Sequence, residues 1–210
     1  MTAPLPIGPS DPSFWAEKYQ GNYRPPWDLG QAAPPLKGFL DRHPELRPGK
    51  TAVVGSGLGN DALLFAQRGF EVVGFDFVAA AIAAAHQAAV QADLPATFLQ
   101  RDVFLLGEEF PQQFDYVVEH TCYCAIDPAR RDDYVRSVHG ILKPGGQFIG
   151  LFRCDAKTNG PPFGSDPEVL QRRFSGQAEG PFERLSFGLA PDSVAARQGK
   201  EYLGWFRKAA

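Results

Sequence analysis

The sequence feature that most restricts the fold is a loop with three alternate glycines, Gly55, Gly57 and Gly59. The β-branched run 51–54 comes directly before this loop, and residues 61–68 follow it with the apolar spacing of a helix. Glycines between a strand and a helix allow a ligand to approach the backbone and to use the free amides at the helix N-terminus. The loop therefore predicts a ligand site at the first strand-to-helix turn of an α/β fold.

An acidic residue ends the next apolar run. Asp76 follows residues 71–75 and stands nineteen residues after Gly57, where a carboxylate can accept hydrogen bonds from both hydroxyls of a ribose. Loop and acid together predict a nucleoside site, although a tight turn and a solvated aspartate would give the same letters. A dinucleotide site would favour Gly-x-Gly-x-x-Gly, but position 60 is Asn and the third glycine falls one residue early, at Gly59. This spacing favours a cofactor without a pyrophosphate over NAD(P).

Strand-like and helical patterns alternate from residue 51 onward, which is typical of a parallel sheet with crossover helices. The tail differs, because its two strand-like runs are separated only by a polar loop and favour an antiparallel hairpin. The predicted fold class is α/β: a Rossmann-like, seven-stranded, mostly parallel sheet flanked by helices. The predicted strands are residues 51–54, 71–75, 96–100, 114–118, 147–152, 182–187 and 200–206, and the predicted helices are residues 61–68, 79–91 and 128–142.

The N-terminal region has its own composition. Residues 1–12 contain four prolines and few apolar groups, which predicts a disordered leader. Residues 13–48 are dense in aromatics and proline and leave room only for short helices, so we expect an arm that lies over the site. Nothing marks a second domain boundary, and residues 13–210 are predicted to form a single domain.

Charge and cysteine content indicate which kinds of partner the chain can be expected to bind. The formal net charge is only −3 with both signs interspersed, which argues against nucleic acid and anionic membranes and favours a small-molecule partner. The three cysteines are Cys122, Cys124 and Cys154; their number is odd and their spacing is not that of a zinc site, so we expect reduced thiols and no metal. Without a signal peptide or membrane span in the sequence, a cytoplasmic location is expected, with the chain a monomer or a weak homodimer.

Several blocks spread over most of the chain resemble one family. The chain is similar to the class I S-adenosylmethionine-dependent methyltransferases, and within them to the thiopurine, thiol and halide methyltransferase group. The blocks that carry the resemblance are Phe14-Trp15-Ala16-Glu17-Lys18-Tyr19, Pro26-Trp27-Asp28-Leu29-Gly30-Gln31, Phe114-Asp115, Cys124-Ala125-Ile126-Asp127-Pro128 with Arg130, Leu142-Lys143-Pro144-Gly145-Gly146, Gly160-Pro161-Pro162-Phe163, and Arg197, Gly199-Lys200-Glu201 and Leu203-Gly204 of the tail.

The resemblance implies S-adenosylmethionine as cofactor, with aromatic residues of the arm covering it. Indole faces suit both partners, because they stack on adenine and attract a sulfonium cation. An acid after the third predicted strand can also address an adenine edge, although a surface aspartate would look the same. The cofactor-binding residues expected on these grounds are Trp15, Tyr19, Trp27, Gly55, Gly57, Asp76, Phe77, Asp102, Val103, Glu119 and His120.

The acceptor is expected to be a small soft nucleophile, namely a thiol, hydrosulfide or halide, bound near Tyr123, Arg153 and Phe163. The sequence departs from the group here, with Glu119 where aspartate is common and Arg153-Cys154 where a Tyr-Pro pair is common. Arg153 could clamp an anionic group of the acceptor, or pair with Glu119 or Asp155.

His120 is the candidate base if the acceptor is a thiol, although a histidine at a strand end is as often a satisfied hydrogen-bonding residue. Cys122 and Cys124 could be nucleophiles, but small buried side chains are the simpler interpretation. Two other functions stay open: methylation of another small anionic metabolite at oxygen or nitrogen, and cofactor binding without turnover. An oxidoreductase is a more remote third.

Overall fold

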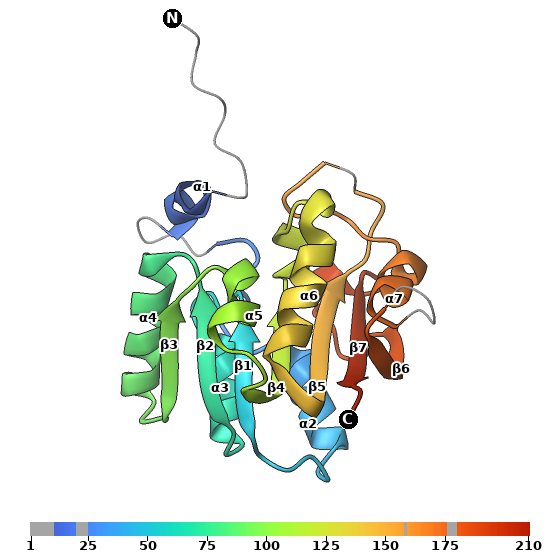
Figure 1. Ribbon diagram of the computed structural model, residues 1–210. Coiled ribbons are helices and arrows are strands. Elements are labelled where there is room, and N and C mark those ends of the chain that lie inside the picture. The colour runs from blue at the N-terminus through green and yellow to red at the C-terminus, as the bar shows by residue number, and fades with distance from the viewer. Residues whose placement is uncertain (1–10, 20–24, 158, 176–179) are drawn as a thin grey trace, which may run out of the picture.

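The computed structural model describes residues 11–19, 25–157, 159–175 and 180–210. These residues form a three-layer α/β sandwich in which one sheet lies between two layers of helices (Figure 1). The predicted leader, residues 1–12, falls outside this description except for its last two residues. Within the described ranges, no helix is both long and apolar enough to cross a membrane.

The sheet has seven strands in the order β3-β2-β1-β4-β5-β7-β6. The first five strands pair in parallel, and β7 pairs antiparallel with both β5 and β6. The order reverses at β1, so the carboxyl ends of β1, β2 and β4 open onto one crevice, where ligands bind in sheets of this kind. The strands are β1 Lys50–Val54, β2 Glu71–Asp76, β3 Ala96–Gln100, β4 Phe114–His120, β5 Leu142–Arg153, β6 Phe182–Leu189 and β7 Glu201–Lys208.

Helices cover both faces of the sheet. On one face, α2 (Pro34–Arg42), α3 (Asn60–Gln67) and α4 (Ala79–Gln91) bury Leu36, Phe65 and Ala85 in one core cluster. On the other face, α5 (Leu106–Glu109), α6 (Arg131–Ile141) and α7 (Pro167–Ser175) bury Leu106, Tyr134 and Phe174 in a second cluster. Burial of these apolar side chains stabilises the sheet that carries the site.

The seven-stranded, mostly parallel sheet and its closing hairpin are confirmed. One boundary differs clearly: β5 begins at Leu142, which we had expected to end the preceding helix. The reason is a register shift, because Phe114 pairs with Leu142 whereas Tyr116 pairs with Gln147. The extra residues between Leu142 and Gln147 bulge out of the ladder, with Gly145 at a φ of 75°.

The predicted arm divides into two parts. Helix α1 (Pro12–Ala16) and the 3-10 helix Glu17–Tyr19 lie beyond the carboxyl ends of the strands, above β2 and β3 in Figure 1. Helix α2 instead buries Leu36, Phe39 and Leu40 against the sheet and is part of the core layer. Among the described residues of 13–48, those before α2 therefore supply the part of the arm at the crevice, whereas α2 belongs to the core layer.

Candidate active site

The glycine loop turns sharply at the end of β1. Gly55 has a φ of 61°, a left-handed conformation that favours glycine, and Ser56 donates a backbone hydrogen bond of 2.9 Å to the carbonyl of Phe75. A Cβ atom at Gly55 would lie 2.8 Å from both Cβ and Sγ of Cys122. Gly59, also left-handed, caps α3, so the first amides of that helix face the crevice. The backbone of the glycine loop is therefore not covered by its own side chains where it borders the crevice.

Asp76 ties the loop to the end of β2. Its Oδ2 accepts a hydrogen bond of 2.9 Å from the amide of Gly57, and its Oδ1 accepts one of 2.9 Å from the amide of Val78. Burial of the carboxyl group raises its pKa, and the two amides partly oppose that rise. At the end of β3, Asp102 accepts a hydrogen bond of 3.0 Å from the amide of Phe104.

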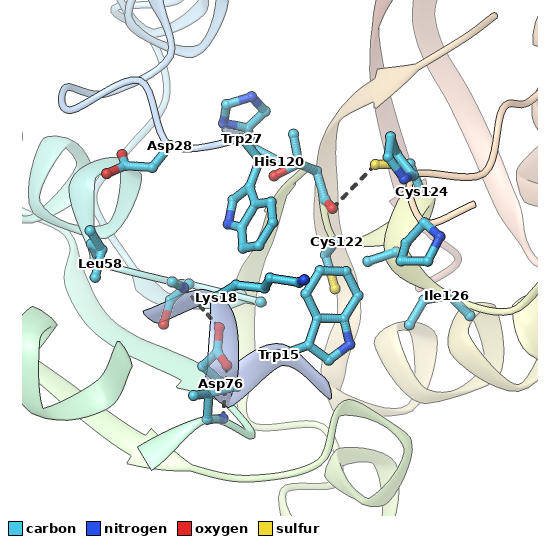
Figure 2. A pocket seen from close by; sticks show the side chains of 18 of the residues that line it. Trp15, Lys18, Trp27, Asp28, Leu58, Asp76, His120, Cys122, Cys124 and Ile126 are labelled. Atoms are coloured by element: carbon cyan, nitrogen blue, oxygen red, sulfur yellow. Dashed lines mark hydrogen bonds between the residues drawn. The ribbon is translucent and has the colours of Figure 1, made fainter. Parts of the chain in front are cut away.

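One cavity of about 640 Å³ runs along the carboxyl ends of the strands. Figure 2 shows Leu58 and Asp76 on one side of it and Cys124 and Ile126 on the other. We call the side at β1, β2 and β3 the nucleoside end, and the side beyond β4 and β5 the acceptor end. Predicted cofactor residues that line the cavity are Trp15, Tyr19, Trp27, Gly55, Gly57, Asp76, Phe77, Asp102, Val103 and His120.

Aromatic residues of the arm lie over the middle of the cavity. The ring centroids of Trp15 and Trp27 are 5.3 Å apart in an edge-to-face arrangement, and Trp27 Nε1 lies 3.4 Å from the hydroxyl of Tyr19. A Cβ atom at Gly57 would lie 3.3 Å from that hydroxyl, which places Tyr19 directly over the glycine loop. Figure 2 shows Lys18 between the two tryptophans and pointing into the cavity. The arm thus forms a roof between the nucleoside end and the acceptor end.

Glu119, predicted to touch the cofactor, is instead completely buried below the cavity wall. Its Oε2 accepts hydrogen bonds of 3.0 Å from the amides of Cys122 and Tyr123, while its Oε1 has no hydrogen-bond partner among the described residues. Burial raises the pKa of Glu119 to about 7, against the opposing effect of these amides. Glu119 therefore stabilises the turn after β4 through hydrogen bonds from the core side and does not line the cavity.

Glu119→Gln is expected to stabilise the protein increasingly as the pH rises from about 4.3, the pKa of a free glutamate, to about 7. A glutamate whose folded pKa is raised stabilises best below its unfolded pKa, and this advantage is lost as the pH rises through the folded value. The amide carbonyl can still accept from both amides. We expect a gain of about 1–3 kcal/mol in the free energy of unfolding at pH 8 relative to pH 5, measured in urea. An equal effect at both pH values would contradict this, and Glu71→Gln on an exposed residue of β2 controls for the change of charge.

His120 lies at the end of β4 with both ring nitrogens engaged. Its Nδ1 is 2.9 Å from Asp61 Oδ2, and its Nε2 is 2.8 Å from Arg197 Nη1 and 3.8 Å from Glu201. Burial lowers the pKa of His120, but Asp61 and Glu201 outweigh this and raise it to about 9. A protonated ring has no free lone pair, and in the neutral ring the Nε2 lone pair faces the guanidinium, which can only donate. In neither state is His120 free to take a proton, so the geometry does not favour a base.

Two residues expected at the acceptor lie elsewhere. Tyr123 is buried in the core, its ring 5.6 Å from that of Phe152 and its hydroxyl accepting a hydrogen bond of 3.0 Å from Arg173. Phe163 donates from its amide to the carbonyl of Cys124 at 2.7 Å, and it is its neighbours Pro161 and Pro162 that line the cavity. The local reason is that the turn after β4 points the ring of Tyr123 into the core, whereas its neighbours Cys122 and Cys124 line the cavity.

Arg153 does line the acceptor end, and it also pairs with Asp155, with Nε and Nη2 at 2.7 and 2.6 Å from Oδ2. The pairing with Asp155 that the sequence left open is thus present, and the role of Arg153 as a clamp for the acceptor stays a prediction. The sequence interpretation missed other lining residues, although the blocks quoted for the resemblance contained most of them. The lining residues that were missed include Lys18, Leu58, Asp61, Ile126, Pro161, Pro162, Arg197, Lys200 and Glu201.

The nucleoside end fits S-adenosylmethionine. The glycine loop leaves its backbone open because a Cβ at Gly55 would collide with Cys122. Asp76 offers a carboxylate at the end of β2, and the indoles of Trp15 and Trp27 suit an adenine ring and a sulfonium cation. No group of three histidine, cysteine or acidic side chains within the described ranges is placed to hold a metal ion.

Comparisons with known proteins agree with this fit. Residues 10–181 match the family model of thiopurine S-methyltransferase. The chain is 31% identical to thiocyanate methyltransferase 1 of Brassica oleracea over 87% of this chain and 80% of that protein. It is 29% identical to thiocyanate methyltransferase 1 of Arabidopsis thaliana over 87% and 79%.

The fold also matches solved structures. The 1,6-didemethyltoxoflavin-N1-methyltransferase of Burkholderia thailandensis, solved with bound S-adenosylhomocysteine, superposes with a TM-score of 0.73 at 21% identity, over all of this chain and 94% of that one. At that identity the likeness speaks for the fold alone, whereas the family model covers most of the sequence. The chain belongs to the thiopurine S-methyltransferase family and is an S-adenosylmethionine-dependent methyltransferase.

Proposed function

We propose that this methyltransferase acts on a small, soft nucleophile that already carries negative charge, such as thiocyanate, hydrosulfide, a halide or the thiolate form of a small thiol. The observation that carries the proposal is the composition of the acceptor end. Its wall combines apolar and sulfur-bearing groups with cationic side chains, and its histidine is not free to act as a base. The apolar and sulfur-bearing residues are Cys122, Cys124, Ala125, Ile126, Pro161 and Pro162, and the cationic residues are Arg153 and Lys200.

The nucleoside end holds the cofactor, which supplies a methyl group on a sulfonium when bound. The backbone of Gly55 and Gly57 and the carboxylate of Asp76 receive the nucleoside, while Trp15 and Trp27 of the roof exclude water and present ring faces to positive charge. Fixing two partners at opposite ends of one cavity favours an in-line displacement, to which positioning alone contributes much of the acceleration.

The acceptor end suits a polarizable anion. Lys200 has no ion pair among the described residues, so its ammonium group can attract a negative acceptor. Each carboxylate on the cavity wall already accepts a hydrogen bond from the protein. These carboxylates are Asp28, Asp61, Asp76, Asp102, Asp127 and Glu201. The curated relatives are named as thiocyanate and thiol methyltransferases, which supports the same acceptor class.

The pH dependence of acceptor use is expected to follow the acceptor and not an enzyme base. Thiocyanate is ionised throughout the range, whereas the thiolate fraction of a small thiol rises tenfold per pH unit below a pKa of about 8.5. The ratio of kcat/KM for the thiol to kcat/KM for thiocyanate should therefore rise about tenfold per pH unit from pH 6 to 8. The ratio cancels titrations of the enzyme that affect both reactions. A flat ratio would indicate a base that deprotonates the bound thiol.

The proposal is tested by following S-adenosylhomocysteine formation with a panel of acceptors: iodide, thiocyanate, hydrosulfide, small and aromatic thiols, and carboxylated metabolites with oxygen or nitrogen nucleophiles. Turnover with the sulfur nucleophiles and iodide is expected. Turnover confined to the carboxylated metabolites would replace the proposed acceptor class, and cofactor binding without any turnover would favour a binding protein.

We also propose that the protein works as a monomer or weak homodimer in the cytoplasm. The three described cysteines are free, and burial raises the pKa of each thiol, to about 12 for Cys124 and Cys154. Thiols of this kind suit a reducing compartment. Sedimentation over a range of protein concentrations and imaging of a tagged copy test the two statements.

A further inference from the structure

Four charged or titratable side chains from distant segments meet beside the cavity. Asp61 comes from α3, His120 from the end of β4, Arg197 from the 3-10 helix Ala195–Arg197, and Glu201 from the start of β7. Their side chains are between 6% and 16% exposed. Arg197 Nη1 lies 2.8 Å from His120 Nε2 and 3.2 Å from Glu201 Oε1, and His120 Nδ1 lies 2.9 Å from Asp61 Oδ2. We call these four residues the Arg197 cluster.

The Arg197 cluster forms hydrogen bonds to the backbone of the arm at two points. The second guanidinium nitrogen, Nη2, donates a hydrogen bond of 2.7 Å to the carbonyl of Trp27, across 170 positions of sequence. At the other side of the cluster, Asp61 Oδ1 accepts a hydrogen bond of 2.7 Å from the amide of Ala33. The chain between Trp27 and Ala33 is therefore fastened at both ends to buried charged groups.

These contacts fix the backbone from which an indole of the roof projects. Figure 2 shows the Trp27 ring over the cavity, with His120 of the cluster next to it in the view. The carbonyl of Trp27 has its bond from a guanidinium that is itself paired with the buried carboxylate of Glu201, so the direction of the residue is set by a rigid support. A lysine cannot reproduce this support, because one ammonium nitrogen replaces a planar fork whose two terminal nitrogens bond Glu201 and the Trp27 carbonyl separately.

We infer that Arg197 is a positioning residue for cofactor binding: through the Arg197 cluster it holds Trp27 over the cofactor, and it does so without being needed for the transfer step itself. Loss of the Arg197 guanidinium should leave Trp27 free to move away from the cavity and should weaken cofactor binding. Once the cofactor is saturating, the rate of methyl transfer should change little, because the groups at the nucleoside end stay in place.

The test compares Arg197→Lys with Arg42→Lys, which alters an exposed arginine paired with Asp192 at 3.0 Å near the same tail segment. By calorimetry, Arg197→Lys should bind S-adenosylhomocysteine about 10- to 100-fold more weakly, as expected for losing buried hydrogen bonds to a charged group, and Arg42→Lys within about twofold of the wild type. KM for S-adenosylmethionine should rise in parallel, with kcat within about threefold.

A double-mutant cycle shows whether the effect passes through Trp27. If it does, Arg197→Lys should add less than about threefold to the loss already caused by Trp27→Ala. Acrylamide quenching gives a second readout in a Trp15→Phe, Trp205→Phe background, where Trp27 is the remaining tryptophan. Its emission should become more accessible in Arg197→Lys.

Three results would overturn the inference: unchanged affinity in Arg197→Lys, additive losses in the cycle, or lost affinity with Trp27 as shielded as before. Additive losses would mean that Arg197 acts on the ligand directly. Melting temperatures accompany each variant, and Arg197→Gln, which keeps one donor group for the Trp27 carbonyl, replaces the lysine variant if that variant does not fold.

Discussion

Gly55→Ala is expected to weaken S-adenosylhomocysteine binding by at least about 20-fold. The left-handed φ of 61° costs an alanine about 1–2 kcal/mol, and the contact of its Cβ with Cys122 at 2.8 Å adds about 1–3 kcal/mol of overpacking. The loop must shift to relieve both, and the loop is the surface that receives the nucleoside. Since each 1.4 kcal/mol is a factor of ten in affinity, the sum of these two effects gives the expected magnitude. Calorimetry measures it directly.

Gly69→Ala is the matched control for this prediction. Gly69 is also left-handed, with a φ of 85°, but its Cβ would have ordinary contact with Pro48 at 3.8 Å, far from the cavity. It should lose stability by the strain alone and keep the affinity for S-adenosylhomocysteine. Equal loss of affinity in both variants would mean that the effect reflects general instability and not the shape of the glycine loop.

Asp76→Asn is expected to reduce cofactor affinity by about 10- to 100-fold, with a smaller loss of stability. The carboxylate accepts from the amides of Gly57 and Val78 on opposite oxygens, and it offers its remaining lone pairs to a ribose. An asparagine must turn an amide donor toward one of these N–H groups, so the glycine loop loses a support, and one oxygen that could accept a ribose hydroxyl is gone. A lost charged hydrogen bond contributes about 1.5–3 kcal/mol.

The control is Asp115→Asn at the opposite end of the sheet. Asp115 also accepts a backbone hydrogen bond, from Lys50 at 2.9 Å, and pairs with Lys143 at 2.7 Å, so its loss should lower stability and leave the cofactor affinity unchanged. Retained affinity in Asp76→Asn would contradict the role of the β2 carboxylate in holding the cofactor.

The parts of the fold that the sequence predicts well are those with strong local patterns. Helix α4 and strand β3 have the predicted bounds, because an alanine-rich run and a short bounded run around Phe98 each favour one regular structure. The glycine loop and its acidic partner were also predictable, since the left-handed turn at Gly55 and the carboxylate of Asp76 follow from residue types at a fixed spacing.

The sequence fails where side-chain direction is set by irregular backbone. After β4 the chain forms a 3-10 turn at Tyr123–Ala125, and no periodicity tells which of its residues faces the cavity. Glu119 follows the same logic, since a carboxylate at a strand end can face the crevice or, as here, cap the turn below it.

The Arg197 cluster shows a second limit. Arg197 and the carbonyl of Trp27 are 170 positions apart, and His120 meets Asp61 across 59. Only the packing of the tail against the arm brings them together, so residue types alone gave His120 the appearance of a free base. The tail motif marked the residues without indicating their partners.

Methyl transfer to a soft anion is measured most directly by mass spectrometry of the product formed from methyl-labelled S-adenosylmethionine and thiocyanate or hydrosulfide. We expect labelled methyl thiocyanate or methanethiol in equal amount with S-adenosylhomocysteine, and at least about tenfold less of both in Gly55→Ala at subsaturating cofactor. S-adenosylhomocysteine formed only with an oxygen or nitrogen acceptor, with no labelled sulfur product, would contradict it.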